Sequence, residues 1–393
     1  MKCRVWIALA AAALAAPLQV QAEPAATIVQ GNPARWNAAK AQAWYAKQDW
    51  ILGANYANAG AINQLDMWQA ATFDAAEIDK ELGWAGKFGM NTMRVYLHDL
   101  AYQQDPEGFK QRLDRFLAIA KKHGIRPILV LFDSCWDPDP RIGPQHRPIP
   151  GVHNSGWLQS PGRRDLLDPA QDERFRRYVE DVVGSFAEDQ RILLWDLWNE
   201  PDNWGGGHFE EEEIAQELRR IEYLLPRVFA WARSQRPVQP LSSGVWAGED
   251  WSPAAAKRSE VQRIQLTESD VITFHDYGWP ESFEARVVQL RPYGRPLICT
   301  EWMARSAGST PDTILPIAHR ENIGMVNWGF VQGAIQTHFP WDSWDRPYIL
   351  KPPTIWFHDL LYPDGRPYRE REAALFRTLS ARKAGQPGAD RPR

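Results

Sequence analysis

Two glutamates in this sequence stand at the ends of short apolar runs that are typical of buried strands. The run 193–198 is followed by Asn199 and Glu200, and the run 296–300 is followed by Glu301. A strand that carries a carboxylate at its C-terminal end places that acid where pockets form in parallel sheets. The chain also contains 20 tryptophans, whose flat faces can stack on the C–H faces of sugar rings. Together these features indicate two-carboxylate chemistry on a sugar.

Short apolar strands alternate with amphipathic helices along most of the chain. We predict strands at 50–56, 92–96, 126–132, 239–243, 271–277 and 324–330, with the strands that end at Glu200 and Glu301 as the fourth and seventh. We predict helices at 74–88, 107–123, 173–186, 211–234, 282–290 and 313–321, and further helices between 354 and 379. Eight such units predict an α/β fold, a single-domain (β/α)8 TIM barrel.

An open doubly wound sheet is the alternative fold for this pattern. That fold usually carries a Gly-rich phosphate loop after an early strand. Here the first strand leads into Ala54-Asn55-Tyr56-Ala57, which contains no glycine, so the barrel is favoured.

The unusual polar and aromatic residues of the predicted barrel gather at the C-terminal ends of its strands. They are Asn55, Arg94, Asp133, Glu200, His275, Tyr277, Glu301 and Trp328. Active sites of such barrels lie at that end, so this placement favours an enzyme. Strands four and seven face each other across the barrel mouth, and we therefore expect Glu200 and Glu301 to meet there.

The motifs around the two glutamates resemble those of clan A glycoside hydrolases, with family 5, the cellulase family, as the nearest member. The resemblance rests on Trp-Asn-Glu-Pro at 198–201 and Thr-Glu-Trp at 300–302, and it covers roughly 50–328. It implies a retaining β-glycoside hydrolase that needs neither a cofactor nor a metal. Glu200 would be its acid/base and Glu301 its nucleophile.

The resemblance also implies roles for the residues around the two carboxylates. Asn199 would hold the hydroxyl next to the reacting carbon, and Arg94 would support the nucleophile. His275 and Tyr277 match the strand-six His-x-Tyr pair, and Trp328 matches the strand-eight tryptophan under the reacting sugar.

The two glutamates need opposite protonation states for this chemistry. A guanidinium such as Arg94 beside Glu301 favours the ionised nucleophile, and Tyr277 can donate a hydrogen bond to the same carboxylate. The acid must be protonated when the leaving group departs, so we expect the site to raise the pKa of Glu200.

The sequence departs from family 5 after the third strand, where a histidine is common. Asp133 or Trp136 would fill that space, or His98 after strand two would reach in. The long loops 133–169 and 336–353 are expected to roof the cleft, which favours chain-end or short substrates. Within the first of them, Asp137, Asp139 and His146 suggest a metal site, but Asp-Pro-Asp-Pro is typical of turns.

The first 22 residues have the pattern of a secretory signal peptide. Lys2 and Arg4 precede an apolar run, 5–16, which is shorter than the roughly 20 residues of a membrane anchor. A small-x-small site predicts cleavage after Ala22. We therefore expect a secreted or periplasmic protein whose residues 23–393 form the barrel domain with C-terminal helices.

The net charge and the cysteine content limit the kinds of partner and metal site that we expect for this protein. The net charge of −4 provides no basic field for nucleic acid. Cys135 and Cys299 lack the spacing of a metal site and do not form a disulfide framework. Cys299 lies two residues before Glu301, so we predict that it is buried and shares a strand face with that residue. A carbohydrate is the expected partner, without nucleic acid or membrane, and a monomer is the expected state.

The leading hypothesis is a retaining hydrolase of β-linked glucan, mannan or xylan, and three alternatives stay open. A transglycosylase would use the same site with a second sugar in place of water. A carbohydrate-binding protein without catalysis would use the same cleft aromatics. A metal-dependent barrel hydrolase is disfavoured, because no His-x-His stands at a predicted strand end.

Overall fold

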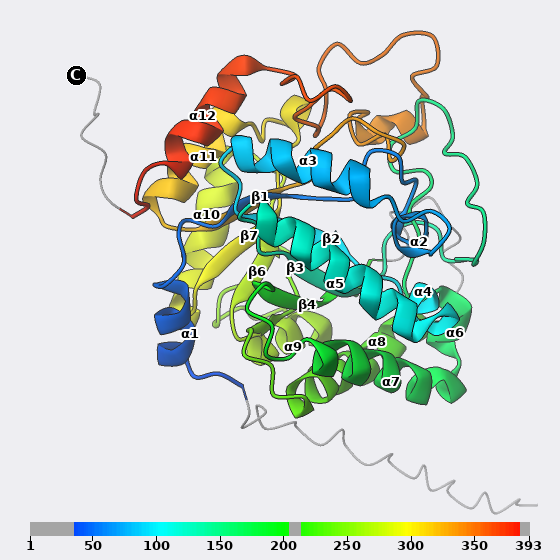
Figure 1. Ribbon diagram of the computed structural model, residues 1–393. Helices are drawn as coiled ribbons and strands as arrows, with labels where there is room; N and C mark the ends of the chain where they lie inside the picture. The colour runs from blue at the N-terminus through cyan, green and yellow to red at the C-terminus, as the bar shows by residue number, and fades with distance from the viewer. Residues whose placement is uncertain (1–34, 204–213, 386–393) are drawn as a thin grey trace, which may run out of the picture.

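Eight parallel strands form the centre of the computed structural model, which describes residues 35–203 and 214–385 (Figure 1). The strands are β1 (Leu52–Asn55), β2 (Thr92–Tyr96), β3 (Ile128–Asp133), β4 (Leu194–Asn199), β5 (Leu241–Ser242), β6 (Ile272–His275), β7 (Leu297–Glu301) and β8 (Gly324–Asn327). Their order is β5-β4-β3-β2-β1-β8-β7-β6, and a parallel bridge between Val245 and Phe274 joins the two ends. The predicted (β/α)8 barrel is confirmed. The predicted signal peptide, 1–22, lies outside the described residues.

Helices surround this barrel (Figure 1). They are α1 (Ala38–Tyr45), α2 (Gln64–Trp68), α3 (Ala75–Lys87), α4 (Asp99–Gln104), α5 (Pro106–Lys122), α6 (Arg163–Leu167), α7 (Asp172–Ser185), α8 (Ile214–Ser234), α9 (Glu260–Glu268), α10 (Pro280–Leu290), α11 (Pro311–Arg320) and α12 (Glu370–Ser380). Helix α5 shows why they form where they do. The Asp105 side chain caps its first turn, Pro106 begins it, and a stripe containing Phe109, Leu113 and Phe116 is buried. Among the described residues, no helix has the length and apolar character that a bilayer crossing requires.

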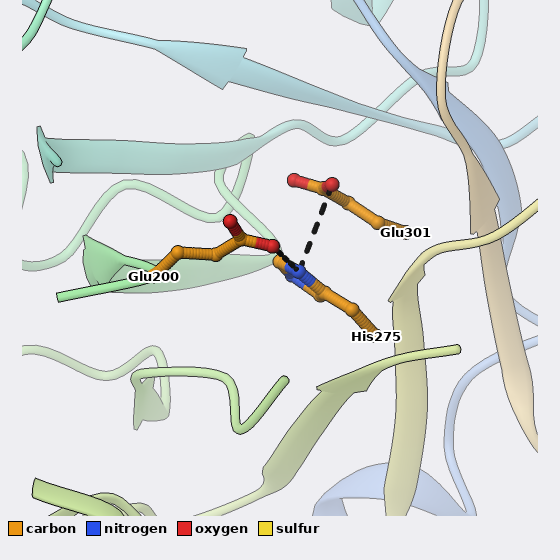
Figure 2. A group of neighbouring side chains, drawn as sticks. All are labelled: Glu200, His275 and Glu301. Carbon is orange, nitrogen blue, oxygen red and sulfur yellow. Dashed lines mark hydrogen bonds and ion pairs between the residues drawn. The ribbon is translucent and has the colours of Figure 1, made fainter. Parts of the chain in front are cut away.

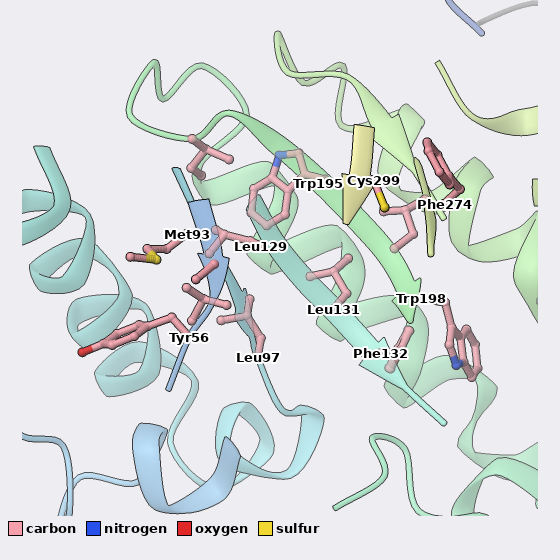
Figure 3. Packing of buried hydrophobic residues seen from close by; sticks show 14 of the residues in the cluster. Tyr56, Met93, Leu97, Leu129, Leu131, Phe132, Trp195, Trp198, Phe274 and Cys299 are labelled. Atoms are coloured by element: carbon pink, nitrogen blue, oxygen red, sulfur yellow. The ribbon is translucent and has the colours of Figure 1, made fainter. Parts of the chain in front are cut away.

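Alternate strand residues face opposite sides of the barrel wall. Met93 and Val95 of β2 join the large apolar cluster between barrel and helices, whereas Arg94 and Tyr96 point inward. Figure 3 shows part of that cluster, including Met93, Leu129 and Trp195. Nearer the N-terminal ends of the strands the barrel interior is apolar, with Ile51, Ile128, Leu194, Ile298 and Val326 in one cluster. The polar site therefore stands on a closed apolar floor.

A β-bulge in β7 changes the direction of its last residue. Phe274 of β6 pairs with Cys299, but the next residue, His275, pairs with Glu301, so β7 holds one extra residue at this point. Cys299 is fully buried, as predicted, and it packs in the outer cluster with Phe274. The prediction that Cys299 shares a face with Glu301 was wrong, because the bulge breaks the two-residue alternation.

The other differences from the predicted elements lie in segments without a clear period. Five helices were not predicted: α1, α2, α4, α6 and α9. Between 354 and 379 the structure has α12 and no second α-helix, since the preceding residues form turns and isolated bridges. The predicted helix 211–234 corresponds to α8, and its first three residues lie outside the described part of the chain.

Candidate active site

Glu200 and Glu301 converge at the C-terminal mouth of the barrel, with His275 between them (Figure 2). His275 Nδ1 lies 2.7 Å from Glu200 Oε1 and 3.6 Å from Glu301 Oε2. One oxygen of each carboxylate and a ring nitrogen of His275 all lie within 4.8 Å of one another. The three side chains are almost entirely buried. The expectation that strands four and seven bring their acids together is therefore met by the geometry.

Glu301 accepts hydrogen bonds from three directions. Arg94 Nη1 donates to its Oε1 over 2.8 Å, and the Tyr96 hydroxyl donates to the same oxygen over 2.9 Å. The Tyr277 hydroxyl donates to Oε2 over 2.8 Å. A carboxylate that faces only donors on its protein side is arranged to act as an anion, which suits a nucleophile.

Arg94 is fully buried and is fixed by five acceptors. Besides Glu301 and the Tyr96 hydroxyl it contacts Asp196 at 2.8 Å, Asn55 Oδ1 at 2.9 Å and Asn199 Oδ1 at 2.7 Å. Burial lowers the pKa of Arg94, but Tyr96 and the two carboxylates outweigh this and hold the pKa well above its usual value. The guanidinium is therefore a permanent cation in the barrel interior.

Sequence reasoning missed Asp196 and Tyr96, although a signal for each was present. Tyr96 stands two residues after Arg94 in β2, and two-residue spacing puts both on the inner face. Asp196 is a single charge inside the apolar run that leads to Glu200, and such a charge needs a buried partner.

Glu200 follows β4 directly and has a left-handed backbone, with φ of 41°. Its Oε1 contacts His275, and its Oε2 accepts from Asn203 Nδ2 at 2.7 Å and from the Cys135 thiol at 3.3 Å. Burial raises the pKa of Glu200, but the hydrogen bonds from His275, Asn203 and Cys135 outweigh it, so the pKa lies below its ordinary value. The expectation of a raised pKa was wrong for this structure. Three donors around one carboxylate favour its ionised form.

The Asn199 side chain is held at both ends. Its Oδ1 accepts from Arg94, and its Nδ2 donates to Asp133 Oδ1 at 2.9 Å. Asp133 also accepts from Trp157 Nε1 at 2.6 Å and from Gln64 Nε2 at 3.1 Å. Burial raises the pKa of Asp133 to about 7, against the lowering effect of these donors. Asp133 thus lies behind Asn199 and orients it.

The other two residues considered for the space after strand three have different positions. His98 is fully buried and accepts from Leu100 N at 3.2 Å, so it caps α4 away from the pocket. Trp136 lines the pocket and stacks on Trp344 with ring centroids 5.0 Å apart and planes at 7°. Asp137 Oδ1 accepts from Asp139 N at 2.9 Å, which is the turn chemistry predicted for that segment.

A pocket of about 520 Å³ contains the two carboxylates, within the size range of small-ligand sites. Aromatic rings form much of its wall: Trp136, Trp246, Tyr277, Trp328 and Trp341. Trp328 packs edge-on against Tyr96 and Trp157, so its ring is held rigidly. Such a pocket combines apolar faces for a ring with a few charged groups at one point.

Glu200, His275 and Glu301 also present ligand atoms close enough to bind a cation. Two carboxylates and one imidazole form a donor set that divalent metals accept. The same atoms serve two-carboxylate chemistry, so only an assay with a chelator separates the two uses.

An eight-stranded barrel with two facing strand-end glutamates, an arginine under one of them and tryptophans around both has the architecture of a glycoside hydrolase barrel. Solved structures of other proteins share this fold. An exo-β-1,4-mannosidase from Opitutaceae bacterium strain TAV5 has a TM-score of 0.56 at 20% identity. The match covers 84% of this chain and 60% of the mannosidase. A GH5 subfamily 18 protein from Streptomyces cattleya, in complex with Manβ1-4GlcNAc, matches 87% of this chain at 14% identity, also with a TM-score of 0.56, and 83% of that chain is covered.

A β-1,4-mannanase from the sea hare Aplysia kurodai has a TM-score of 0.52 at 14% identity. The match covers 78% of this chain and 96% of the mannanase. At these identities the similarity establishes the fold. A probable mannan endo-1,4-β-mannosidase A-2 of Aspergillus terreus is 28% identical over 96 residues, which are 24% of this chain and 22% of that protein. No protein-family model matches the chain.

Proposed function

We propose that this protein is a retaining β-glycoside hydrolase. The observation that carries the proposal is the approach of Glu200 and Glu301. One carboxylate oxygen of Glu200 lies within 4.8 Å of one carboxylate oxygen of Glu301. Retaining enzymes hold their two carboxyl groups about 5–5.5 Å apart, whereas inverting enzymes need about 6.5–9.5 Å to admit a water. The close pair in this pocket supports retention.

In the first step Glu301 attacks the anomeric carbon, and the bond from that carbon to the leaving oxygen breaks. Glu200 gives its proton to the leaving oxygen, and a glycosyl ester of Glu301 forms. In the second step Glu200 takes a proton from water, whose oxygen attacks the same carbon and releases Glu301. Arg94, Tyr96 and Tyr277 hold Glu301 in place. They stabilise its negative charge before the first step and again when the second step releases the carboxylate.

The proposed substrate is a β-linked mannoside of the mannan type. The similar structures named above are described as a β-1,4-mannosidase, a β-1,4-mannanase and a protein in complex with Manβ1-4GlcNAc. Their shared sugar supports mannose over glucose or xylose. The sequence pattern of 1–22 supports a secreted or periplasmic protein that meets such a substrate outside the cytoplasm.

The experiment compares Glu301→Gln and Glu200→Gln with the unchanged protein on aryl β-mannoside, β-glucoside and β-xyloside and on mannan. Each substitution keeps the side-chain shape, and Glu281→Gln on exposed α10 is the matched control. Turnover of the β-mannoside is expected to fall nearly to zero in Glu301→Gln. Loss of general acid help in Glu200→Gln is expected to cost about 10²–10⁴-fold.

Proton NMR of the first product gives the stereochemical outcome, and retention of the β-anomer is expected. Full activity in Glu301→Gln, or an inverted product, contradicts the proposed mechanism. Activity that disappears with a chelator and returns with a metal favours the metal-dependent alternative. Longer products at high acceptor concentration show transfer to a second sugar, and binding without turnover of any glycoside shows a carbohydrate-binding protein.

A further inference from the structure

Two long loops are joined to each other beside the pocket. We call residues 149–157 and 335–348 together the loop wall; the first follows β3 and the second follows β8. Gly151 N donates to Gln336 Oε1 at 3.0 Å, and Tyr348 N donates to Gly151 O at 2.9 Å. His153 N donates to Ser343 Oγ at 2.9 Å. The two loops lie next to each other at the upper right of Figure 1. Hydrogen bonds in both directions make the wall one structural unit.

The loop wall forms part of the lining of the pocket that holds the two carboxylates. Trp157 of the wall contacts Trp328 with ring centroids 5.7 Å apart, and His153, Asn154 and Trp341 of the wall line the pocket. Under the proposed function, a sugar that offers its anomeric carbon to Glu301 lies over Trp328. The part of that ring far from the reacting carbon then meets the wall.

Two polar side chains of the wall are positioned to bind hydroxyl groups. Asn154 is 1% exposed, and its Oδ1 is buried without a hydrogen-bond partner in the described part of the chain. Its backbone is left-handed, with φ of 53°, a conformation that asparagine tolerates better than most residues. A buried acceptor without a donor is costly, so this oxygen is suited to a hydroxyl from a ligand.

A hydrogen bond defines the tautomer of His153, the residue next to Asn154. Its Nδ1 lies 2.9 Å from Phe339 O, and because a carbonyl only accepts, the proton is on Nδ1. Burial lowers the pKa of His153 to about 4, so the ring is neutral near pH 7. Nε2 is then an acceptor for a second hydroxyl.

We infer that the enzyme acts from the chain end and removes one sugar at a time from the non-reducing terminus. This inference rests on the proposed function and adds its mode of action. Asn154 and His153 bind the free hydroxyls of the terminal sugar, and the joined loops stand against that sugar where a further unit would have to continue. A chain that extended past this point would replace a donating hydroxyl by an ether oxygen, and Asn154 Oδ1 would stay unpaired.

The test uses β-1,4-mannopentaose labelled at its reducing end, together with the aryl β-mannoside. Free mannose and a labelled chain one unit shorter are the expected first products. A pentaose methylated at O4 of its non-reducing sugar is expected to be cut at least tenfold more slowly. Labelled trisaccharide or disaccharide among the first products overturns chain-end action. Failure to cleave either substrate contradicts the proposed function instead.

Two variants connect this mode of action to the loop wall. A Cβ at Gly151 would lie 2.6 Å from the Tyr348 backbone carbon, and the residue has φ of +75°, so Gly151→Ala must push the loops apart. Gly143→Ala is the matched control, because Gly143 also has positive φ and a Cβ there meets nothing within 4 Å. The ratio of internal to terminal cleavage is expected to rise severalfold in Gly151→Ala and to stay unchanged in Gly143→Ala.

Asn154→Ala tests the bound hydroxyl without moving the loops. KM for the aryl β-mannoside is expected to rise about tenfold with a smaller change in kcat, since a lost hydrogen bond of this kind weakens binding. Discrimination against the O4-methylated pentaose is expected to shrink as well. Unchanged KM and unchanged discrimination in a folded Asn154→Ala protein overturn the role of Asn154, even where Gly151→Ala fails to fold.

Discussion

His275 Nδ1 lies 2.7 Å from Glu200 Oε1, and this pair is central to the ionisation of the proposed acid/base. Burial alone would raise the pKa of Glu200, but His275 leads a set of donors that bring the pKa below its usual value. A proton donor with a lowered pKa works best in acid. The structure therefore ties the pH range of the enzyme to one imidazole.

Replacing this imidazole is expected to move the basic limb of the pH profile. Activity requires protonated Glu200, so kcat/KM falls as pH rises through the pKa of Glu200. His275→Ala removes the strongest donor and raises that pKa, so the basic limb moves to higher pH while kcat falls. The measurement is kcat/KM against pH on the aryl glycoside. His123→Ala, which removes a helix-surface histidine paired with Asp79, is the control. An unmoved basic limb in His275→Ala contradicts the assignment.

Tyr277 is expected to contribute through its single hydrogen bond to Glu301 Oε2. Tyr277→Phe keeps the ring and removes only the hydroxyl. Hydrogen bonds to charged groups are worth about 1.5–3 kcal/mol, so kcat/KM is expected to fall about 10–150-fold. Tyr45→Phe is the matched control, since Tyr45 is buried and donates to Asn322 O at 3.1 Å, far from the pocket. Equal losses in both variants would mean a general packing effect.

Arg94 is expected to be as important for stability as for chemistry. Arg94→Met leaves Asp196 and Glu301 buried without their cation. Removing one partner of a buried pair costs about 3–5 kcal/mol, so the free energy of unfolding is expected to fall by that amount. Arg366→Met is the control: Arg366 pairs with Asp364 on the surface, where a pair contributes about 0–1 kcal/mol. Urea unfolding midpoints measure both, and equal midpoints for the two variants would count against a structural role for Arg94.

Asp133 is expected to make stability depend on pH between about 4 and 7. Its pKa is about 7 in the folded protein and about 3.9 in the unfolded chain, so in this range the folded state holds a proton that the unfolded state has lost. Stability then falls as pH rises through this window. Asp133→Asn removes this contribution, so the difference in unfolding free energy between the two proteins should change from pH 5 to pH 8.

Glu81, whose pKa burial raises to about 7, contributes with the same sign in both proteins and cancels in that difference. A difference between the proteins that is constant with pH would show that Asp133 titrates near its ordinary value.

Much of the barrel was predictable because its elements have strong local patterns. Strand β2 has the predicted bounds 92–96, and α5 differs by one residue at each end from the predicted helix. Helix α9 was missed because its residues, including the capping box of Ser259 and Gln262, lie in a polar segment without a clear apolar stripe. Strand β5 has only two residues, too few for a period to appear.

The sequence by itself determined which side chains stand at the strand ends, since a parallel barrel brings all those ends to one mouth. It thereby identified Glu200, Glu301, Arg94, His275 and Tyr277 as neighbours. Only the tertiary structure decided the direction of the Glu301 side chain, the ionisation of Glu200 and the shape of the pocket wall. A bulge turns Glu301 inward, donors from β6 and from loops lower the pKa of Glu200, and two loops almost 200 residues apart in sequence join into a wall. Each depends on contacts between distant segments, which no local period records.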